Sequence, residues 1–414
     1  MIKKFKKDSY KISIVGIVGC VLAGAIILTN SVNVKALDIN NTTSTTNIMN
    51  IPKFLVDTPT KTYDNIGRVE KVAGFEFKLP DFPRSDKAES LQLIKLSDKD
   101  NVLLIYLDGD INFTFQVSEK EPLEYLKKIG NIKNGLSNLK VESEEQAMKL
   151  GEIDGFSVTV TSISPAETLK SGDVRPEFKE VNKYFAWKNE GLWYSIGYNS
   201  TVTSSAQNNT QSHNISQDDL EKIAKSIVYP EEIKNVNYSV EKEASTEIAT
   251  MMIYEKEDLE KAKSFLGFNP KFPLKINEDI SIKESSIGIS GDSDIKNNNI
   301  NYELTSFYSN KSGSITFTEK KNLKYYEDIL KNGYINIWDN ENEKNKQVKG
   351  EKININNNEV WKYLYTEILE DGTSINNGEY IWKENNIYYS VCFFEDTDNS
   401  DEIIKEFVNS KTVD

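Results

Sequence analysis

Three short stretches contain residue types that together can carry out nucleophilic acyl transfer. They are "SNLK" at 137–140, "SHN" at 212–214 and "KSG" at 311–313, in that order along the chain. In such an arrangement a lysine activates the hydroxyl of a nearby serine, and a Lys–Ser–Gly strand holds the substrate. Ser137 is then the candidate nucleophile and Lys140 the candidate base.

The same boxes, in the same order, occur in penicillin-recognising serine enzymes, but two observations argue against a working site here. Each box is short and consists of residues that are abundant in this chain, so chance matches are expected. The boxes also fall in two copies of an internal repeat, so one active site would require two domains to interleave. We therefore expect no enzyme activity and no catalytic residues, and keep a cell-wall-directed serine hydrolase of this type as the alternative.

Metal chemistry finds equally little support. His213 is the only histidine, and the Ser- and Asn-rich stretch around it predicts an exposed loop rather than a rigid zinc or triad site. The stretch from Asp396 resembles a calcium loop, but it lacks Gly at position six and has Phe407 where a bidentate Glu is required. In "GDSDIK", Lys296 takes the fifth ligand position. We expect no metal and no cofactor.

Charge is distributed unevenly along the chain. The 414 residues carry a formal net charge of −14, although the first 36 residues hold six Lys and only one Asp. The remainder is strongly acidic, which disfavours nucleic acid and anionic lipid as partners. Cys20 lies in the apolar N-terminal segment, so no disulfide with Cys392 is expected.

The N-terminal residues have the pattern of an export signal. A basic start is followed at 12–28 by 17 residues without charge, and then by the small residues Val34 and Ala36 at the positions that signal peptidase reads. This predicts, over 1–36, a signal peptide cleaved after Ala36 or an uncleaved membrane anchor. Residues 37–60 are rich in Asn, Thr and Pro and are expected to form a flexible spacer.

One aromatic stretch occurs in two similar copies. Residues 181–199 read "VNKYFAWKNEGLWYSIGYN" and residues 376–394 read "NNGEYIWKENNIYYSVCFF", which places Trp187 on Trp382 without a gap. Apolar residues alternate on either side of the turn-forming "KNEG" and "KENN", so each copy predicts a β-hairpin. Large aromatic residues at such positions mostly fill cores, so we expect both tryptophans to be buried.

Other segments repeat in the same order. The patterns predict paired helices at 63–75 and 256–268, strand–helix units at 115–129 and 315–329, strands at 155–163 and 360–368, and closing helices at 216–227 and 400–411. The expected N-cap residues are Asn65 and Asp258, Ser118 and Thr318, and Ser216 and Ser400. Gly74 and Gly267 suit the left-handed end of the first pair of helices.

This order of elements predicts an α+β fold made of two tandem similar domains. Each domain is expected to be an antiparallel sheet with helices packed on one face. The expected boundaries are domain 1 at 61–230, a linker at 231–254 and domain 2 at 255–414.

The repeated elements also resemble a known family. The stretches "LGFNPKFP", "KSGSITF" and "AKSI", together with the Trp-Lys-x-x-x-[Leu/Ile]-[Trp/Tyr]-Tyr hairpin, resemble the uncharacterised extracytoplasmic domain of Gram-positive anti-sigma-type membrane proteins and related envelope proteins, here as a tandem pair. The resemblance covers about two thirds of each copy. Only eleven residues precede the apolar run, where that family carries a cytoplasmic sigma-binding domain, so we do not expect sigma-factor binding. The family offers no catalytic residues to carry over.

The sequence therefore predicts a non-enzymatic envelope protein, secreted or anchored to the cell membrane by its N-terminal segment. Its two domains are expected to bind or sense an extracytoplasmic protein or a cell-wall ligand. No nucleic acid is expected, and membrane contact is expected through the N-terminal segment only. A purely structural spacer remains a further alternative.

Overall fold

The computed structural model describes most of the chain after the predicted export signal. The described residues are 54–84, 86–97, 100–122, 126, 140–168, 174–204, 209–240, 251–290, 293, 300–309, 313–321, 324–339, 344–368, 373–394 and 399–413. The predicted signal or anchor at 1–36 and most of the predicted spacer lie outside these residues. Within them, none of the helices combines the length and the apolar content that a bilayer crossing requires.

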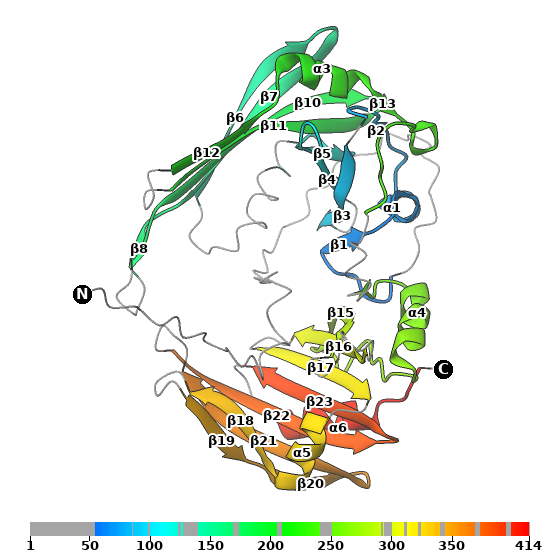
Figure 1. Ribbon diagram of the computed structural model, residues 1–414, viewed down its shortest axis with the longest axis vertical. Helices are drawn as coiled ribbons and strands as arrows, with labels where there is room; N and C mark the ends of the chain where they lie inside the picture. Colours follow the sequence, from blue (N-terminus) through cyan, green and yellow to red (C-terminus); the bar gives the residue numbers. More distant parts are fainter. Residues whose placement is uncertain are drawn as a thin grey trace, which may run out of the picture.

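The first half of the described chain forms a nine-stranded sheet (Figure 1). Its strands pair antiparallel in the order β1 (Thr60–Tyr63), β3 (Lys87–Ser97), β4 (Asp100–Asp108), β5 (Phe113–Ser118), β11 (Leu192–Ser204), β10 (Phe178–Asn189), β7 (Ile153–Ser164) and β6 (Lys140–Leu150). The ninth strand, β12 (Asn209–Asn214), pairs with the part of β11 that extends beyond β5.

The second half forms an eight-stranded sheet with the corresponding order of strands (Figure 1). The order is β14 (Met251–Met252), β15 (Ser281–Ile289), β16 (Tyr302–Ser309), β17 (Ser314–Lys321), β23 (Ile387–Phe394), β22 (Ser374–Glu384), β21 (Asn358–Ile368) and β20 (Glu351–Ile355). Three small two-stranded sheets pair β2 (Leu79–Pro80) with β13 (Ile227–Val228), β8 (Glu167–Thr168) with β9 (Val174–Arg175), and β18 (Tyr334–Asp339) with β19 (Lys344–Lys349).

The described helices are short. They are α1 (Ile66–Ala73), α3 (Gln217–Lys225), the 3₁₀ turn η1 (Pro230–Glu232), α4 (Lys256–Leu266), α5 (Lys324–Asn332) and α6 (Ser400–Asn409). Gly74 and Gly267 end α1 and α4 with positive φ, as expected for a residue without a Cβ. The predicted α+β class is therefore wrong, because long antiparallel strands dominate both halves and few helices accompany them.

The expected cover on one face is also wrong, because both faces of each sheet are buried. The near face, defined here as the face that carries Trp187 or Trp382, packs against α1 and α3 in the first sheet and against α4 and α6 in the second. The far face, which is the opposite one, packs against Leu126 in the first sheet and against α5 in the second. Successive apolar residues such as those at 185–187 and 380–382 place apolar side chains on both faces, so each face needs cover.

The aromatic hairpins occupy equivalent places. Trp187 pairs across the hairpin with Tyr194, and Trp382 pairs in the same way with Tyr389. The two hairpin turns, at 190–191 and 385–386, have positive φ at both central residues, which is the geometry of tight two-residue hairpins. The expected burial of both tryptophans is confirmed, since Trp187 is 2% exposed and Trp382 is 0% exposed.

The alignment of 115–129 with 315–329 is off by two residues. Phe115 pairs with Ile196 in the first sheet, and Phe317, rather than Ile315, pairs with the corresponding Val391 in the second. Phe115 and Phe317 also lie against the equivalent tryptophans, with ring centroids 6.4 and 6.1 Å apart. A shift of two keeps each side chain on its face, so the alternation in the sequence does not reveal the error.

Several helix starts differ from the prediction. Asn65 and Ser216 cap α1 and α3 as expected. Asp258 instead lies inside the first turn of α4, where its Oδ2 accepts hydrogen bonds from the backbone N–H groups of Tyr254 and Glu255.

The last two expected caps of the second half are also displaced. Thr318 lies within β17, which continues to Lys321, and α5 begins only at Lys324. Asn399 is the N-cap of α6, while Ser400 is its first residue and shares a 2.8 Å hydrogen bond with the hydroxyl of Tyr380. Ser400 is therefore taken up by a tertiary partner, and Thr318 by the continuing strand. Ser118 ends β5. Most of the helix predicted after it lies outside the described residues.

The expected spacer and linker are partly packed against the sheets. Val56 is buried in the near-face core of the second sheet, whereas Tyr238 and Tyr254 are buried in that of the first. The backbone N–H groups of Leu55 and Val56 both donate to the carbonyl of Tyr254, at 2.8 and 3.2 Å. The two segments therefore cross at the junction, and each carries an apolar side chain into the core of the other half.

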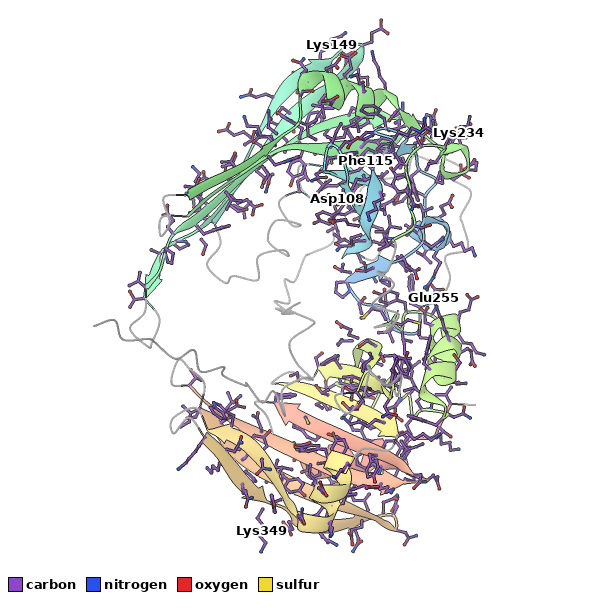
Figure 2. The ribbon with its side chains drawn as sticks, in the orientation of Figure 1. Asp108, Phe115, Lys149, Lys234, Glu255 and Lys349 are labelled. Atoms are coloured by element: carbon purple, nitrogen blue, oxygen red, sulfur yellow. The ribbon has the colours of Figure 1, made fainter. Side chains whose placement is uncertain are left out.

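A salt bridge also joins the two halves. Arg68 of α1 lies 3.0 Å from Asp258 and 3.6 Å from Glu255, at the start of α4. Figure 2 places Glu255 where the two halves of the chain meet. The backbone N–H of Thr62 adds a 2.9 Å hydrogen bond to the hydroxyl of Tyr254.

Candidate functional site

The described members of the three serine-enzyme boxes lie on different sheets. Lys140 begins β6 at the edge of the first sheet and Asn214 ends β12 in the same sheet, whereas Gly313 directly precedes β17 of the second sheet. Lys140 is exposed and forms a salt bridge of 2.6 Å with Glu142. Ser137, Lys311 and Ser312 lie outside the described residues.

The candidate metal ligands are not assembled either. His213 is exposed as expected, but it belongs to strand β12, where it pairs with Ser200, rather than to a loop. Within the described part of the chain, no group of three or more His, Cys, Asp or Glu side chains is arranged to hold a metal ion. Asp396 and most of "GDSDIK" lie outside that part.

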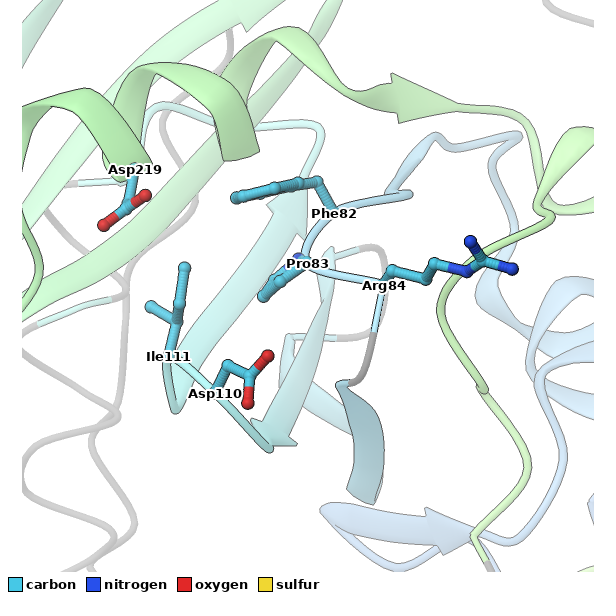
Figure 3. A pocket seen from close by; sticks show the side chains of 6 residues that line it. All are labelled: Phe82, Pro83, Arg84, Asp110, Ile111 and Asp219. Carbon is cyan, nitrogen blue, oxygen red and sulfur yellow. The ribbon is translucent and has the colours of Figure 1, made fainter.

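A hollow of about 520 Å³ opens on the first half of the chain. Phe82, Pro83 and Ile111 form its apolar part, while Arg84, Asp110 and Asp219 provide charges of both signs (Figure 3). The hollow is open. Oδ1 of the buried Asp86 accepts from the backbone N–H of Asp110, one of its lining residues, at 2.8 Å, whereas Oδ2 has no partner among the described residues. These side chains form no nucleophile–base pair, so the hollow offers contacts but no evident reaction.

A different constellation lies on the far face of the second sheet. Tyr363 of β21, Glu379 of β22 and Cys392 of β23 are direct cross-strand neighbours and therefore form one row across three strands. In the next row, Tyr365 pairs with Asn377. We call these five residues, together with Tyr325 and Tyr326 of α5 and with Ser390, the Glu379 cluster.

Two buried polar atoms of the Glu379 cluster have no hydrogen-bond partner among the described residues. They are the hydroxyl of Tyr363, on a side chain that is fully buried, and Oδ1 of Asn377, on a side chain that is 2% exposed. The amide nitrogen of Asn377 donates to Glu367 at 3.0 Å, so only the amide oxygen lacks a described hydrogen-bond partner. Buried polar atoms normally find partners, and an unpartnered one points to an absent ligand, water or functional role.

Glu379 is the charged centre of this cluster. Its Oε1 accepts a long hydrogen bond of 3.4 Å from Ser390, and the carboxyl is otherwise surrounded by tyrosine rings. Burial, only partly offset by Ser390 and by the ammonium of Lys320, raises the pKa of Glu379 to about 7. An acid with this pKa changes its charge near neutral pH, which is a frequent property of functional sites.

The cluster is covered from one side by α5 and from another by a small hairpin. Tyr325 and Tyr326 lie with ring centroids 5.6 Å apart on α5. Both strands of the hairpin β18–β19 contact β21. Gly350, directly after β19, lies against the ring of Tyr363, because a Cβ built on it would lie 2.4 Å from that ring. Tyr325 remains 40% exposed and Glu379 is half-buried, so the cluster is reached from the surface at these two residues.

The corresponding row of the first sheet has no ionisable acid. Val158, Tyr184 and Gly197 occupy the places of Tyr363, Glu379 and Cys392. A Cβ on Gly197 would lie 3.4 Å from the ring of Tyr184, so that ring covers the glycine and closes the row. The acid and the tyrosine beside it therefore belong to the second sheet alone within this comparison. Asn377 has a counterpart in Asn182, which is half-buried and donates to Glu180 at 2.8 Å.

A second unusual acid lies on the near face. Glu319 is 1% exposed in the core beside Tyr389, at the place that Val117 takes in the first sheet. Its Oε2 accepts from the backbone N–H of Lys271 at 2.8 Å, and burial raises its pKa well above the usual value. The ammonium of Lys271 donates to Glu384 and to the carbonyl of Val408. Because these contacts join the start of the second near-face core to its hairpin and to α6, we interpret this pair as structural.

Sequence reasoning missed the Glu379 cluster because it followed the other face of the same strand. The residues Tyr380 and Trp382 carry the repeat, whereas Glu379 alternates with them and stands where the first copy has Tyr184. Asn377 keeps its counterpart in Asn182. A usable signal was an acid at a strand position whose two neighbours across the sheet are aromatic or apolar. Pairing β22 with both β21 and β23 was needed to see it.

Comparison with known proteins finds no family that matches the chain and no curated protein similar to it.

Proposed function

We propose that this chain is an exported or membrane-anchored, non-enzymatic envelope protein that binds or senses an extracytoplasmic partner. The partner is a protein or a cell-wall ligand, contacted by the Glu379 cluster of the second sheet. Membrane contact is confined to the N-terminal segment, and the acidic body disfavours nucleic acid.

The observation that carries this proposal is the pair of unpartnered buried atoms beside Glu379. The hydroxyl of Tyr363 and Oδ1 of Asn377 are withdrawn from water without a described partner, which costs stability unless a bound group completes them. The first sheet shows that the same strand order does not require Tyr363 or Glu379, because it has Val158 and Tyr184 where they stand. It keeps Asn182 at the place of Asn377, but that side chain is half-buried rather than buried. A cost that the fold does not need is more simply explained by a binding role.

Export is supported by the basic start, the 17 uncharged residues and the small residues at 34 and 36. The resemblance to extracytoplasmic domains of envelope proteins agrees with this location. A membrane-impermeant biotin reagent applied to intact cells tests it, since an exported chain is labelled on its many surface lysines. Labelling that occurs only after cell lysis contradicts export.

Photo-crosslinking on intact cells tests the binding role. Benzoylphenylalanine replaces Tyr325, which is 40% exposed at the mouth of the cluster, and in a matched control it replaces Val174, which is 66% exposed on the first half. We expect an adduct with an envelope component from position 325 only, and we expect Glu379→Gln in the same chain to abolish it. Equal adducts from both positions, or none from 325, would support a passive spacer instead.

The serine-hydrolase alternative has a separate test. A fluorescent β-lactam would form a covalent acyl adduct with a working serine nucleophile of this class. We expect no labelling of the purified chain. Labelling that disappears in Ser137→Ala would overturn the non-enzymatic proposal.

A further inference from the structure

We propose that the Glu379 cluster binds the primary ammonium group of an alkylamine. This inference rests on the proposed binding role and names the chemical class of the ligand. The observations behind it are the polarity of the unpartnered atoms, the carboxyl at the centre of the row and the aromatic rings around them.

The first step concerns the kind of partner that the free atoms need. Oδ1 of Asn377 is an acceptor, the carboxyl of Glu379 is an acceptor when ionised, and the oxygen of Tyr363 can also accept. Three acceptors grouped on neighbouring positions of one face match a group with three N–H donors. A primary ammonium is such a group, whereas an anion would place like charges together.

The second step concerns the aromatic side chains. Tyr325, Tyr326 and Tyr365 surround the carboxyl, and Glu379 contributes to the raised pKa of each of their hydroxyls. Tyrosine faces attract cations, and they also pack well against the methylene groups of an alkyl chain. The cluster already holds one internal example, because the ammonium of Lys320 lies 4.7 Å from the centre of the Tyr326 ring.

Lys320 does not itself occupy the proposed ligand position. Its ammonium is paired with Glu303 of β16 at 3.0 Å, and both side chains are largely buried. Lys320 therefore has its own acid, and the net charge at the cluster remains negative. An exposed acidic cluster alone would not indicate a ligand, but the buried unpartnered atoms of Tyr363 and Asn377 supply the independent observation.

The charge state of Glu379 gives the proposal a pH dependence. Other charged or titratable groups on the elements packed around it include Glu303, Lys320, Lys324, Tyr325, Tyr326, Glu327, Asp328, Lys331, Lys344, Lys346, Lys349, Tyr363, Tyr365, Glu367, Lys383, Tyr388 and Cys392. Burial raises the pKa of Tyr325 to about 12, so this hydroxyl stays neutral across physiological pH. Since the pKa of Glu379 is about 7, ionisation of this acid should strengthen ammonium binding about tenfold between pH 6 and pH 8.

Ligand-observed NMR on the purified full-length chain tests the inference. The first probe is n-butylammonium, with tetramethylammonium as a cation without N–H donors and n-butanol as a neutral analogue. Two further probes distinguish the source of the amine: Nα-acetyl-lysine N-methylamide represents a lysine side chain of a peptide, and alanine methyl ester represents an amine beside an ester. We expect n-butylammonium to bind and both n-butanol and tetramethylammonium to bind at least about tenfold more weakly.

Two variants and one matched control complete the design. Glu379→Gln should weaken n-butylammonium binding about tenfold and remove its pH dependence, and Tyr325→Leu, at an exposed position, should weaken it without disturbing the fold. Glu351→Gln removes one negative charge from exposed β20 and should change nothing. Equal binding by Glu379→Gln and Glu351→Gln, or equal binding of n-butylammonium and n-butanol, would overturn the assignment.

The result is separable from the proposed function. If Tyr325 still yields a crosslink on cells that requires Glu379 while none of the amines binds, the binding role stands and the ligand class is wrong. If the amines bind and no crosslink forms, the ligand class stands and the partner on the cell is not contacted through this cluster.

Discussion

On the far face of the first sheet, Ile94, Leu104 and Val158 form an aliphatic layer around Leu126. On the far face of the second sheet, Tyr326, Tyr363 and Tyr388 take up the equivalent layer, and Glu379 lies among them. The near faces differ much less. In each, the tryptophan lies between a tyrosine of its own hairpin and a phenylalanine of the neighbouring strand. One face therefore builds the fold in both halves, and the other face is where the halves have become different.

The lysines of the crossing segments show the same contrast on a smaller scale. Lys78 and Lys271 occupy corresponding places after the glycines that end α1 and α4, and each reaches an acid near the hairpin turn. The backbone N–H of Lys78 donates to the hydroxyl of Tyr194, whereas that of Lys271 donates to the buried carboxyl of Glu319. The repeat keeps the lysine and changes what its backbone contacts.

The largest expected effect tests the shared near-face core. Trp187→Ala and Trp382→Ala each remove a buried indole, so each should lower the free energy of unfolding by about 3–5 kcal/mol. Urea unfolding, followed by circular dichroism, measures both. A large loss for one and a loss below about 1 kcal/mol for the other would break the equivalence of the two hairpins.

The next largest effect separates the two lysines. Lys271→Met keeps the apolar stem but removes hydrogen bonds to Glu384 and to the carbonyl of Val408, and Lys271 is only 2% exposed. We expect a loss of about 2–3 kcal/mol in the free energy of unfolding, since hydrogen bonds of a buried charged group are lost. Lys78→Met is the matched control, and we expect a smaller loss from it, because its partner Glu190 is exposed to solvent. Equal losses would mean that burial does not distinguish the contributions of the two lysines to stability.

A pH series tests the acid that replaces Val117. Burial raises the pKa of Glu319 above that of the unfolded chain, so the folded state holds a proton that the unfolded state releases. Stability is therefore fully present below the unfolded value of 4.5 and falls as pH rises towards the folded value. Urea unfolding at a series of pH values above 4.5 should therefore show a declining free energy of unfolding, to which Glu379, with its pKa raised to about 7, also contributes.

Glu319→Gln supplies the comparison for that series. The amide oxygen can still accept the hydrogen bond from Lys271, but the side chain no longer titrates. We expect this variant to lose part of the decline above pH 4.5 in urea unfolding. The same decline in both proteins would assign the pH dependence to other groups.

The smallest expected effect concerns the junction between the halves. Arg68 pairs with Asp258 at 3.0 Å, but its side chain is one third exposed, so the coupling energy should be about 0.5–1 kcal/mol. A double-mutant cycle with Arg68→Ala and Asp258→Asn measures it, because asparagine preserves an acceptor at the start of α4. A coupling near zero would indicate that the exchanged apolar segments, rather than this salt bridge, hold the halves together.

Much of the local structure followed from the sequence. The alternation in 181–199 and 376–394 determined two hairpins with buried tryptophans, because a strand with period two must hide one face. Asn65, Ser216, Gly74 and Gly267 marked helix ends correctly, because a cap or a left-handed stop depends on one side chain and its adjacent backbone.

Only the tertiary structure decided the rest. The dominance of sheet over helix and the cover on both faces depend on which strands become neighbours. So does the equivalence of Phe115 and Phe317, because a two-residue shift leaves the alternation in the sequence unchanged. The Glu379 cluster likewise arises from three strands that bring residues 363, 379 and 392 into one row. Cross-strand proximity is a property of the assembled sheet, whereas periodicity belongs to each strand by itself, and this is why the sequence indicated the core but not the candidate site.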